Sequence, residues 1–162
     1  MSAPSQEPTI QEELQNAFPF LREHIKVARE RRVFVETPLE NFQEVFEHVV
    51  KKMGFSILCT ITGLDMGEKL GAIYHLARPT GVILSLSTNV SKQAPVIHSI
   101  TPYFPAADAY ERELVDLLGF KVEGLPAGSR YPLPDGWPEG QYPLRKDWKA
   151  SMLEKDEGKN AQ

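Results

Sequence analysis

The sequence predicts an α+β fold, in which a mainly antiparallel sheet of about four strands is packed by helices and followed by an extended C-terminal arm. Segments with apolar residues at helical spacing alternate along the chain with short segments rich in β-branched residues. The last predicted helix is followed by residues 120–148, which combine prolines and glycines with aromatic side chains. These two observations carry the prediction, and the elements follow from them in order.

Two helices are predicted in the first third of the chain. Thr9 and Glu12 have the spacing of a capping box, and apolar residues recur at helical spacing after them. Thr37 and Glu40 form a second such pair ahead of a longer apolar stripe, which Gly54 ends. Both helices are therefore expected to begin at a threonine cap.

The strands are predicted from β-branched residues, alternating polarity and a Pro-Thr-Gly turn at 79–81. The predicted strands are 25–27 and 32–35, which are short or form one bent stretch, and then 55–62, 70–78 and 82–88. Such strands need a cover on their apolar face. We expect the helix that begins at Thr37 to supply it.

The following segment is predicted to be irregular, with a possible short helix near 97–103. A last helix is expected from Pro105, because apolar residues recur at helical spacing until Gly119, a natural C-terminal stop. The chain is accordingly divided into a flexible N-terminus (1–8), an α+β domain (9–119), an extended interaction arm (120–148) and a flexible C-terminal tail (149–162).

The composition of the arm indicates that it lies on a surface. A disordered linker is poor in aromatic residues, and a structureless loop of this length is unusual inside a compact domain. The arm nevertheless contains Tyr131, Trp137, Tyr142 and Trp148. The surface is either the chain's own sheet or a partner protein, and the two interpretations can coexist.

Bulk properties exclude several classes of protein. The 162 residues carry a formal net charge of −4, which argues against binding to nucleic acid or to anionic lipid. The polar first residues lack the core of a signal peptide, and the apolar runs are too short to span a bilayer. The single cysteine, Cys59, fits a reducing cytosol and is expected to be a small buried residue.

The sequence contains few candidate catalytic groups. Phosphate-binding loops and paired metal-ligand histidines are absent from the sequence. Asp65 and Glu68 flank a turn and are expected to be solvated, although two neighbouring carboxylates can also perform acid–base chemistry. A small enzyme using Asp65, Glu68 or His75 is therefore kept as an alternative, as is a standalone module that binds a small ligand.

The last predicted helix carries a charged cluster, Glu111, Arg112 and Glu113, with Asp116 beyond it. Arg112 and Asp116 are four residues apart and are expected to meet on one helix face. If exposed, such a pair contributes about 0.3–0.5 kcal/mol. If buried, Arg112 can instead hold carboxylates in a fixed fork geometry. The local pattern leaves both possibilities open.

Residues 111–120, Glu-Arg-Glu-Leu-Val-Asp-Leu-Leu-Gly-Phe, resemble the signature of the 30 kDa (or C) subunit family of respiratory complex I, the NADH:quinone oxidoreductase. The family includes the equivalent subunit of membrane-bound energy-converting nickel–iron hydrogenases. Residues 97–107, 133–137 and 142–147 resemble the flanking segments. Leu125 stands where the family usually has a histidine or a similar polar residue, and this departure leaves open whether the chain belongs to the complex I branch or to the hydrogenase branch.

The resemblance implies a non-catalytic subunit of the peripheral arm, which would support electron transfer to quinone. Family members carry no cofactor; iron–sulfur clusters, flavin or a nickel–iron centre belong to partner subunits. The implied partners are the large catalytic subunit, which has the quinone or nickel–iron site, and the iron–sulfur subunits. The implied location is the cytoplasmic face of the cell membrane, with membrane contact only through partners.

No catalytic, cofactor-binding or metal-binding residue is expected in this chain. Glu111, Arg112 and Asp116 are expected to brace the start of the arm, and the arm's aromatic and basic residues are expected to touch the partner. The residues assigned to the partner interface and to the family signature are Glu111, Arg112, Glu113, Asp116, Arg130, Tyr131, Trp137, Tyr142, Arg145 and Lys146.

Overall fold

The computed structural model describes residues 6–153; the ends predicted to be flexible, residues 1–5 and 154–162, lie outside the described residues. The chain forms two compact units. The first contains the residues up to Thr62 together with Ala72–Asn89, and the second contains Gly63–Gly71 together with the residues from Val90 onward. The predicted separation of a 9–119 domain from a 120–148 interaction arm stays a prediction.

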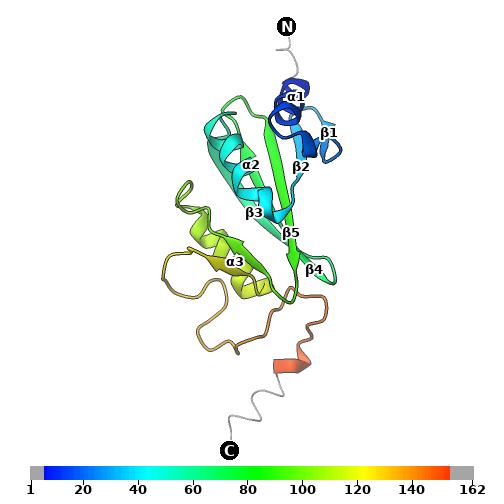
Figure 1. Ribbon diagram of the computed structural model, residues 1–162. Helices are drawn as coiled ribbons and strands as arrows, with labels where there is room; N and C mark the ends of the chain where they lie inside the picture. The colour runs from blue at the N-terminus through cyan, green and yellow to red at the C-terminus, as the bar shows by residue number, and fades with distance from the viewer. Residues whose placement is uncertain (1–5, 154–162) are drawn as a thin grey trace, which may run out of the picture. The chain divides into compact units, whose positions relative to one another are not determined.

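A five-stranded sheet has the strand order β1-β2-β5-β4-β3 (Figure 1). It is mostly antiparallel, as expected, but β2 and β5 pair in parallel. The sequence predicted each of these strands to within a few residues. Their bounds are β1 Ile25–Arg29, β2 Arg32–Glu36, β3 Ile57–Asp65, β4 Lys69–Ala77 and β5 Ile83–Ser91.

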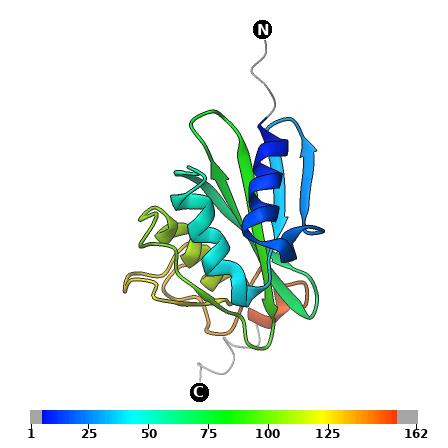
Figure 2. The ribbon, with the colours of Figure 1, turned by 45° about the horizontal axis from the view of Figure 1, so that its top comes forward.

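Helices α1 (Glu7–Ala17) and α2 (Leu39–Lys51) both lie in front of the strands in Figure 2, and η1 (Pro19–Leu21) follows α1. The predicted apolar stripe of α2 is confirmed, because Phe42 and Phe46 are buried and pack against Tyr74 of β4. The ring centroid of Tyr74 lies 4.7 Å from that of Phe42. The two helices therefore cover the same face of the sheet.

The predicted capping boxes are wrong for both helices. Helix α1 begins at Glu7, so Thr9 lies within it, and the buried carboxylate of Glu7 instead accepts a hydrogen bond from the main-chain N–H of Arg31. Helix α2 begins two residues after Thr37, whose N–H donates to the Ser87 carbonyl oxygen over 2.9 Å. Strand pairing therefore extends to Thr37 and takes the place of the cap.

In the second unit, strand β6 (Val96–His98) and strand β7 (Lys121–Glu123) pair in parallel, and helix α3 (Ala107–Leu118) lies between them in sequence. The short helix expected near 97–103 is therefore wrong: β6 occupies the start of that range, and turns follow it. Helix α3 ends at Gly119 as predicted, and the φ angle of this glycine is 76°.

Cys59 is exposed, which corrects the expectation of a buried residue. The reason is the position of its strand, because β3 is at the edge of the five-stranded sheet and its side chains are mostly exposed or half-buried. Among the described residues, no helix combines the length and the apolar character needed to cross a bilayer.

Candidate functional site

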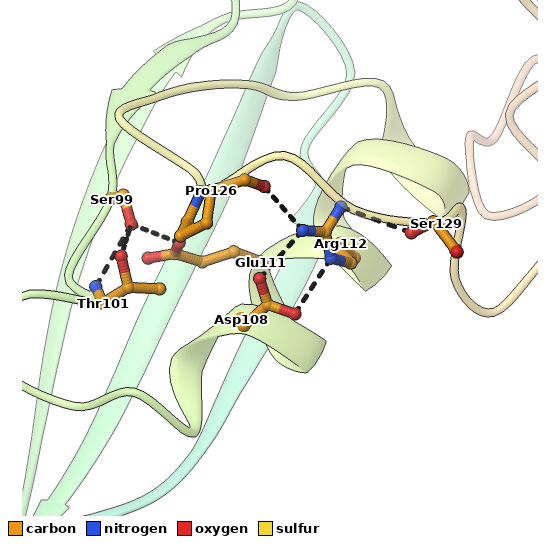
Figure 3. Close-up of polar contacts among 7 residues, drawn as sticks. All are labelled: Ser99, Thr101, Asp108, Glu111, Arg112, Pro126 and Ser129. Atoms are coloured by element: carbon orange, nitrogen blue, oxygen red, sulfur yellow. Dashed lines mark hydrogen bonds and ion pairs between the residues drawn. The ribbon is translucent and has the colours of Figure 1, made fainter.

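Glu111 is the buried centre of the family signature, with an exposed fraction of 0%. One of its carboxylate oxygens accepts a hydrogen bond from the Ser99 hydroxyl over 2.7 Å (Figure 3). The other accepts one from the Ile100 N–H over 2.7 Å. Burial raises the pKa of Glu111. The side chain therefore fixes the segment after β6 against α3.

Arg112 joins the helix to the first part of the arm (Figure 3). Its Nε and Nη2 atoms each donate to the carboxylate of Asp108 over 2.9 Å, which holds the pKa of Asp108 below its usual value. Nη2 also donates to the Pro126 carbonyl oxygen over 2.6 Å, and Nη1 donates to that of Ser129 over 3.3 Å. The guanidinium thus bonds two main-chain oxygens of the arm.

Arg112 and Asp116 line the same hollow and interact electrostatically, as their spacing predicted, but their direct ion-pair partners are Asp108 and Arg130 respectively. The Asp116 carboxylate accepts one hydrogen bond from Nε of Arg130 and one from the N–H of Leu133, each over 3.1 Å. Arg130 in turn donates from Nη1 to the Trp137 carbonyl oxygen over 2.7 Å. Asp116, with an exposed fraction of 6%, therefore holds a second stretch of the arm.

A third anchor lies at the end of α3. Nε of Arg145 donates to the Leu118 carbonyl oxygen over 2.7 Å, and the N–H of Leu144 donates to that of Leu117 over 3.0 Å. The Arg145 guanidinium carbon lies 4.5 Å from the centre of the Tyr142 ring, a cation–π geometry. The main-chain carbonyls that the helix end leaves unpaired are thus used to bind the arm.

The last anchor is Asp65, at the end of β3. The ammonium of Lys92 donates to its carboxylate over 2.7 Å, and the N–H of Lys146 donates to the same oxygen over 2.8 Å. Lys92 also donates to the carboxylate of Asp147 over 3.0 Å. The Asp65 side chain is 2% exposed, so the expectation of a solvated turn residue is wrong.

The indole rings of the arm are also held internally. The indole nitrogen of Trp137 donates to the Gln141 carbonyl oxygen, and that of Trp148 donates to the Gln141 side chain. The two ring centroids are 6.0 Å apart. Trp137 is therefore half-buried within the arm, and its predicted contact with a partner stays a prediction.

The remaining predicted residues are less constrained. Tyr131 is 47% exposed, and the side chain of Lys146 is exposed although its main chain is bonded. Glu113 is half-buried, and its side chain forms no hydrogen bond or ion pair with another residue of the described range. A hollow of about 480 Å³ is lined by residues of both α3 and the arm, among them Arg112, Arg130 and Tyr131.

The groups considered for acid–base chemistry have structural partners. Both Asp65 oxygens are occupied, since the second accepts from the Gly67 N–H over 2.8 Å. The ring nitrogens of His75 lie within 3.1 Å of the hydroxyls of Thr62 and Ser85, and burial lowers its pKa. In residues 6–153, no group of three or more His, Cys, Asp or Glu side chains is placed to hold a metal ion.

Sequence reasoning missed Asp108, Arg145 and Asp65 as anchors of the arm. A signal existed for Asp108, because it stands four residues before Arg112, and an acid that precedes its basic partner is the more favourable order in a helix. Asp65 is separated from Lys146 by 81 residues, and no local pattern joins two such positions.

Comparison with known proteins places this geometry in a family. The family model described as "Respiratory-chain NADH dehydrogenase, 30 Kd subunit" matches residues 35–153, which include α3 and the arm. The C subunit of the NADH-quinone oxidoreductase of Moorella thermoacetica is 32% identical over 143 residues, covering 85% of this chain and 92% of the relative. The membrane-bound hydrogenase subunit beta of Pyrococcus furiosus is 32% identical over 122 residues, covering 73% and 70% respectively.

One relative is a longer polypeptide. The C/D subunit of the NADH-quinone oxidoreductase of Phocaeicola vulgatus is 32% identical over 123 residues, which are 73% of this chain but 23% of that protein. Among solved structures, a chain of the membrane-bound sulfane sulfur reductase, an archaeal respiratory membrane complex, matches with a TM-score of 0.78 and 26% identity. The match covers 96% of this chain and 92% of the other. The chain belongs to the family of the 30 kDa subunit of respiratory-chain NADH dehydrogenase, as the sequence signature predicted.

Proposed function

We propose that the chain is a non-catalytic subunit in the peripheral arm of a complex I-type NADH:quinone oxidoreductase, where residues 120–148 dock on the large catalytic subunit. The observation that carries the proposal is how the charges of α3 are used. Arg112 and Asp116 bind main-chain groups of the chain's own arm, and the buried Glu111 binds the segment before the helix. Arg112 and Asp116 hold the docking segment in place and leave its outward side chains for the partner.

The identity of the docking partner is supported by the fused relative. In the C/D protein, as its name says, one polypeptide carries the C and the D subunit, so the matched domain is covalently linked to a second subunit of the complex. The outward side chains of the arm suit a protein contact, because Tyr131 and Leu144 are 47% and 57% exposed and aromatic anchors dominate such interfaces. The hollow beside Tyr131 offers space for a side chain of the large subunit.

In this proposal, the iron–sulfur clusters, flavin or nickel–iron centre lie in neighbouring subunits, and this chain fixes the position of the large subunit. The chain reaches the cytoplasmic face of the membrane through those partners. The equivalent subunit of a membrane-bound hydrogenase is the second candidate, favoured by the match to the Pyrococcus furiosus protein. Nickel analysis of the purified complex separates the two candidates, because only the hydrogenase contains a nickel–iron centre.

The test replaces the chain, in cells that make the complex, with a tagged Tyr131→Ala/Leu144→Asp variant. The matched control is Phe20→Ala in η1, which is 42% exposed and lies in the other unit. We expect the arm variant to fold normally but to recover at least about tenfold less large subunit, as for the loss of an interface anchor. Undiminished recovery of the large subunit, or an equal loss in the control, would contradict docking through the arm.

A further inference from the structure

Residues 22–34, which we call the basic hairpin, carry five Arg or Lys and two Glu residues. Their formal charge is +3, in a chain whose total charge is −4. The segment runs through β1 and β2 and ends one residue before the family match begins at residue 35. The family signature therefore does not account for this concentration of positive charge.

The cations of the basic hairpin are available for an external partner. Among the described residues, Lys26 and Arg29 form no ion pair, and Arg31 approaches only Glu30, over 3.8 Å between two largely exposed side chains. The hairpin is nevertheless held in place, because the main-chain N–H of Arg31 donates to the buried Glu7 carboxylate. The Arg31 carbonyl oxygen accepts from the Ile83 N–H over 3.0 Å. Binding would therefore not need to order the backbone first.

Strand register places an aromatic ring among these charges. Lys26 lies opposite Phe34, and Phe34 lies opposite Ser85, so all three side chains are on the same face of the sheet. Val33 and Val35, which alternate with Phe34 along β2, are buried and lie on the opposite face of the sheet. Phe34 is 42% exposed on the open face. It lines a groove of about 460 Å³ together with His24, Lys26, Ala28, Glu36 and Ser87.

We propose that the basic hairpin is a second docking surface, which binds an acidic surface of another protein subunit with an apolar side chain seated in the groove beside Phe34. The charges are complementary to an acidic surface, and such pairs steer association and fix register. Four of the five cations are arginines, which are enriched at protein interfaces. A groove with an aromatic wall suits a protruding side chain better than the flat headgroup layer of a membrane.

The position of β1 at the sheet edge offers a simpler explanation for the charges of the basic hairpin, and the test must distinguish this explanation from docking. Strand β1 is an edge of the five-stranded sheet, and charged side chains on an edge prevent pairing with a second copy of the chain. If that is their role, removing the charges will produce self-association while the composition of the complex is unchanged. If the docking proposal is correct, a subunit will be lost without self-association.

The test uses paired variants of the full chain, tagged and expressed in cells that make the complex. Lys26→Gln/Arg29→Gln is compared with Lys51→Gln/Lys52→Gln, and Phe34→Ser is compared with Leu39→Ser, whose side chain is 37% exposed. All of these positions lie in the first unit. We expect both hairpin variants to retain the large subunit and to lose one further subunit by about tenfold or more, which the controls retain.

Two further measurements identify the contact. Recovery of the lost subunit with the unmutated chain should fall between 50 and 500 mM NaCl, because exposed charge pairs are screened. Carbodiimide treatment of the purified complex, which joins amines to carboxylates, should link Lys26 to an Asp or Glu of that same subunit. A cross-link to a carboxylate elsewhere in this chain alone would overturn the proposal.

The other possible results of these experiments would contradict docking through the basic hairpin. The proposal fails if the hairpin variants keep every subunit, or if they self-associate in sedimentation while the complex is complete. It also fails if the isolated chain binds phosphatidylglycerol vesicles through Lys26 and Arg29 while the complex is unaffected, since the surface then binds lipid. Loss of the large subunit through Tyr131 and Leu144 is independent of these results, so the two docking proposals stand or fall separately.

Discussion

Glu111 is a carboxylic acid with no exposed surface, and its hydrogen-bond partners explain why an acid occupies the centre of the signature. It accepts from the Ile100 N–H and from the Ser99 hydroxyl, and the same hydroxyl lies 2.7 Å from that of Thr101. A buried donor without an acceptor costs about 1–3 kcal/mol. The acid is therefore a structural acceptor for the turn before α3.

Replacing Glu111 tests this role. We expect Glu111→Ala to lower the free energy of unfolding by about 2–4 kcal/mol, because two buried donors lose their acceptor. Glu111→Gln keeps a carbonyl oxygen for Ile100, and Ser99 can turn its hydroxyl to accept from the new amide, so its cost should be less than about 1 kcal/mol. Denaturant unfolding measures both values. Equal losses in the two variants would refute the acceptor role.

The difference in stability between the Glu111→Gln variant and the unmutated chain is expected to depend on pH. Burial raises the pKa of Glu111 above its ordinary value of 4.5, so the folded state holds this proton more tightly than the unfolded state. The resulting stabilisation is present below pH 4.5 and is lost as the pH rises through the raised pKa. Glu111→Gln lacks this loss, so its stability relative to the unmutated chain should increase over that interval. An unchanged difference between pH 4 and pH 8 would contradict the prediction.

The stability contributed by Asp65 is expected to depend on pH in the opposite direction. The ammonium of Lys92 holds the pKa of Asp65 well below its ordinary value of 3.8. The stabilisation from this pair is present above pH 3.8 and is lost as the pH falls toward the lowered pKa. We expect Asp65→Asn to destabilise the protein at pH 7 and to approach the unmutated chain in stability below pH 3.8. Glu68→Gln, an exposed change on the same turn, should show neither effect in unfolding measured across this range.

At the scale of elements, the end of α3 and the arm depend on one glycine. Gly119 has a φ angle of 76°, a left-handed conformation that other residues adopt only with strain. A Cβ atom at this position would also lie 2.6 Å from Cε2 of Tyr142 and 2.7 Å from Nη2 of Arg145. The helix therefore ends at a residue that lets the returning arm pass against it.

Gly119→Ala is expected to lower the free energy of unfolding by about 1–3 kcal/mol, since it combines backbone strain with a displaced anchor. The matched control is Gly136→Ala in the same arm, where a Cβ atom would meet nothing within 4 Å. This control should stay within about 0.5 kcal/mol of the unmutated chain. Thermal or denaturant unfolding of the three proteins decides the question, and equal values for both variants would argue against a close passage at Gly119.

Some helices and strands could be predicted correctly from the sequence. Helix α3 and the apolar stripe of α2 were predicted because burial repeats with the helical period, as at Phe42, Val45, Phe46 and Val49. The cap at Thr37 was predicted wrongly because strand pairing took over its main-chain N–H, and the cap at Thr9 because α1 begins two residues earlier, at Glu7. The exposure of Cys59 depends on which strand lies at the edge, and the order of strands in a sheet is not contained in the pattern of a single strand.

For the whole molecule, the sequence indicated that Glu111, Arg112 and Asp116 brace the arm. Arg112 and Asp116 bond to the arm, whereas Glu111 bonds to the segment before α3, and Arg112 forms its ion pair with Asp108 and not with Asp116. Helical spacing places both Asp108 and Asp116 beside Arg112, and Asp116 is instead bonded by Arg130, which the fold brings to it. Contacts between distant segments, such as Asp65 with Lys146, follow from the path of the arm. That path has no periodicity from which it could be predicted.

Because the arm is hydrogen-bonded to other parts of its own chain, we expect it to be ordered before any partner binds. The N–H groups of Leu133, Leu144 and Lys146 donate to Asp116, to the Leu117 carbonyl oxygen and to Asp65 respectively. In the isolated chain, these amides should exchange with deuterium more slowly than an unstructured peptide, by on the order of tenfold or more. Exchange of all three at the unstructured rate would show that the arm becomes ordered only on assembly.

The anchors of the arm have a consequence for how such a subunit can diversify. Arg112 holds the carbonyl oxygens of residues 126 and 129, Arg130 holds that of residue 137, and Asp116 holds an N–H group of residue 133. Carbonyl oxygens are common to all amino acids, so these main-chain bonds do not themselves restrict the side chains at residues 126 and 129, and the route of the backbone can persist when those side chains change. Substitutions can thus change the chemical character of the outward surface while the backbone keeps its path. A subunit with this one fold can therefore be used in oxidoreductase complexes that act on different substrates.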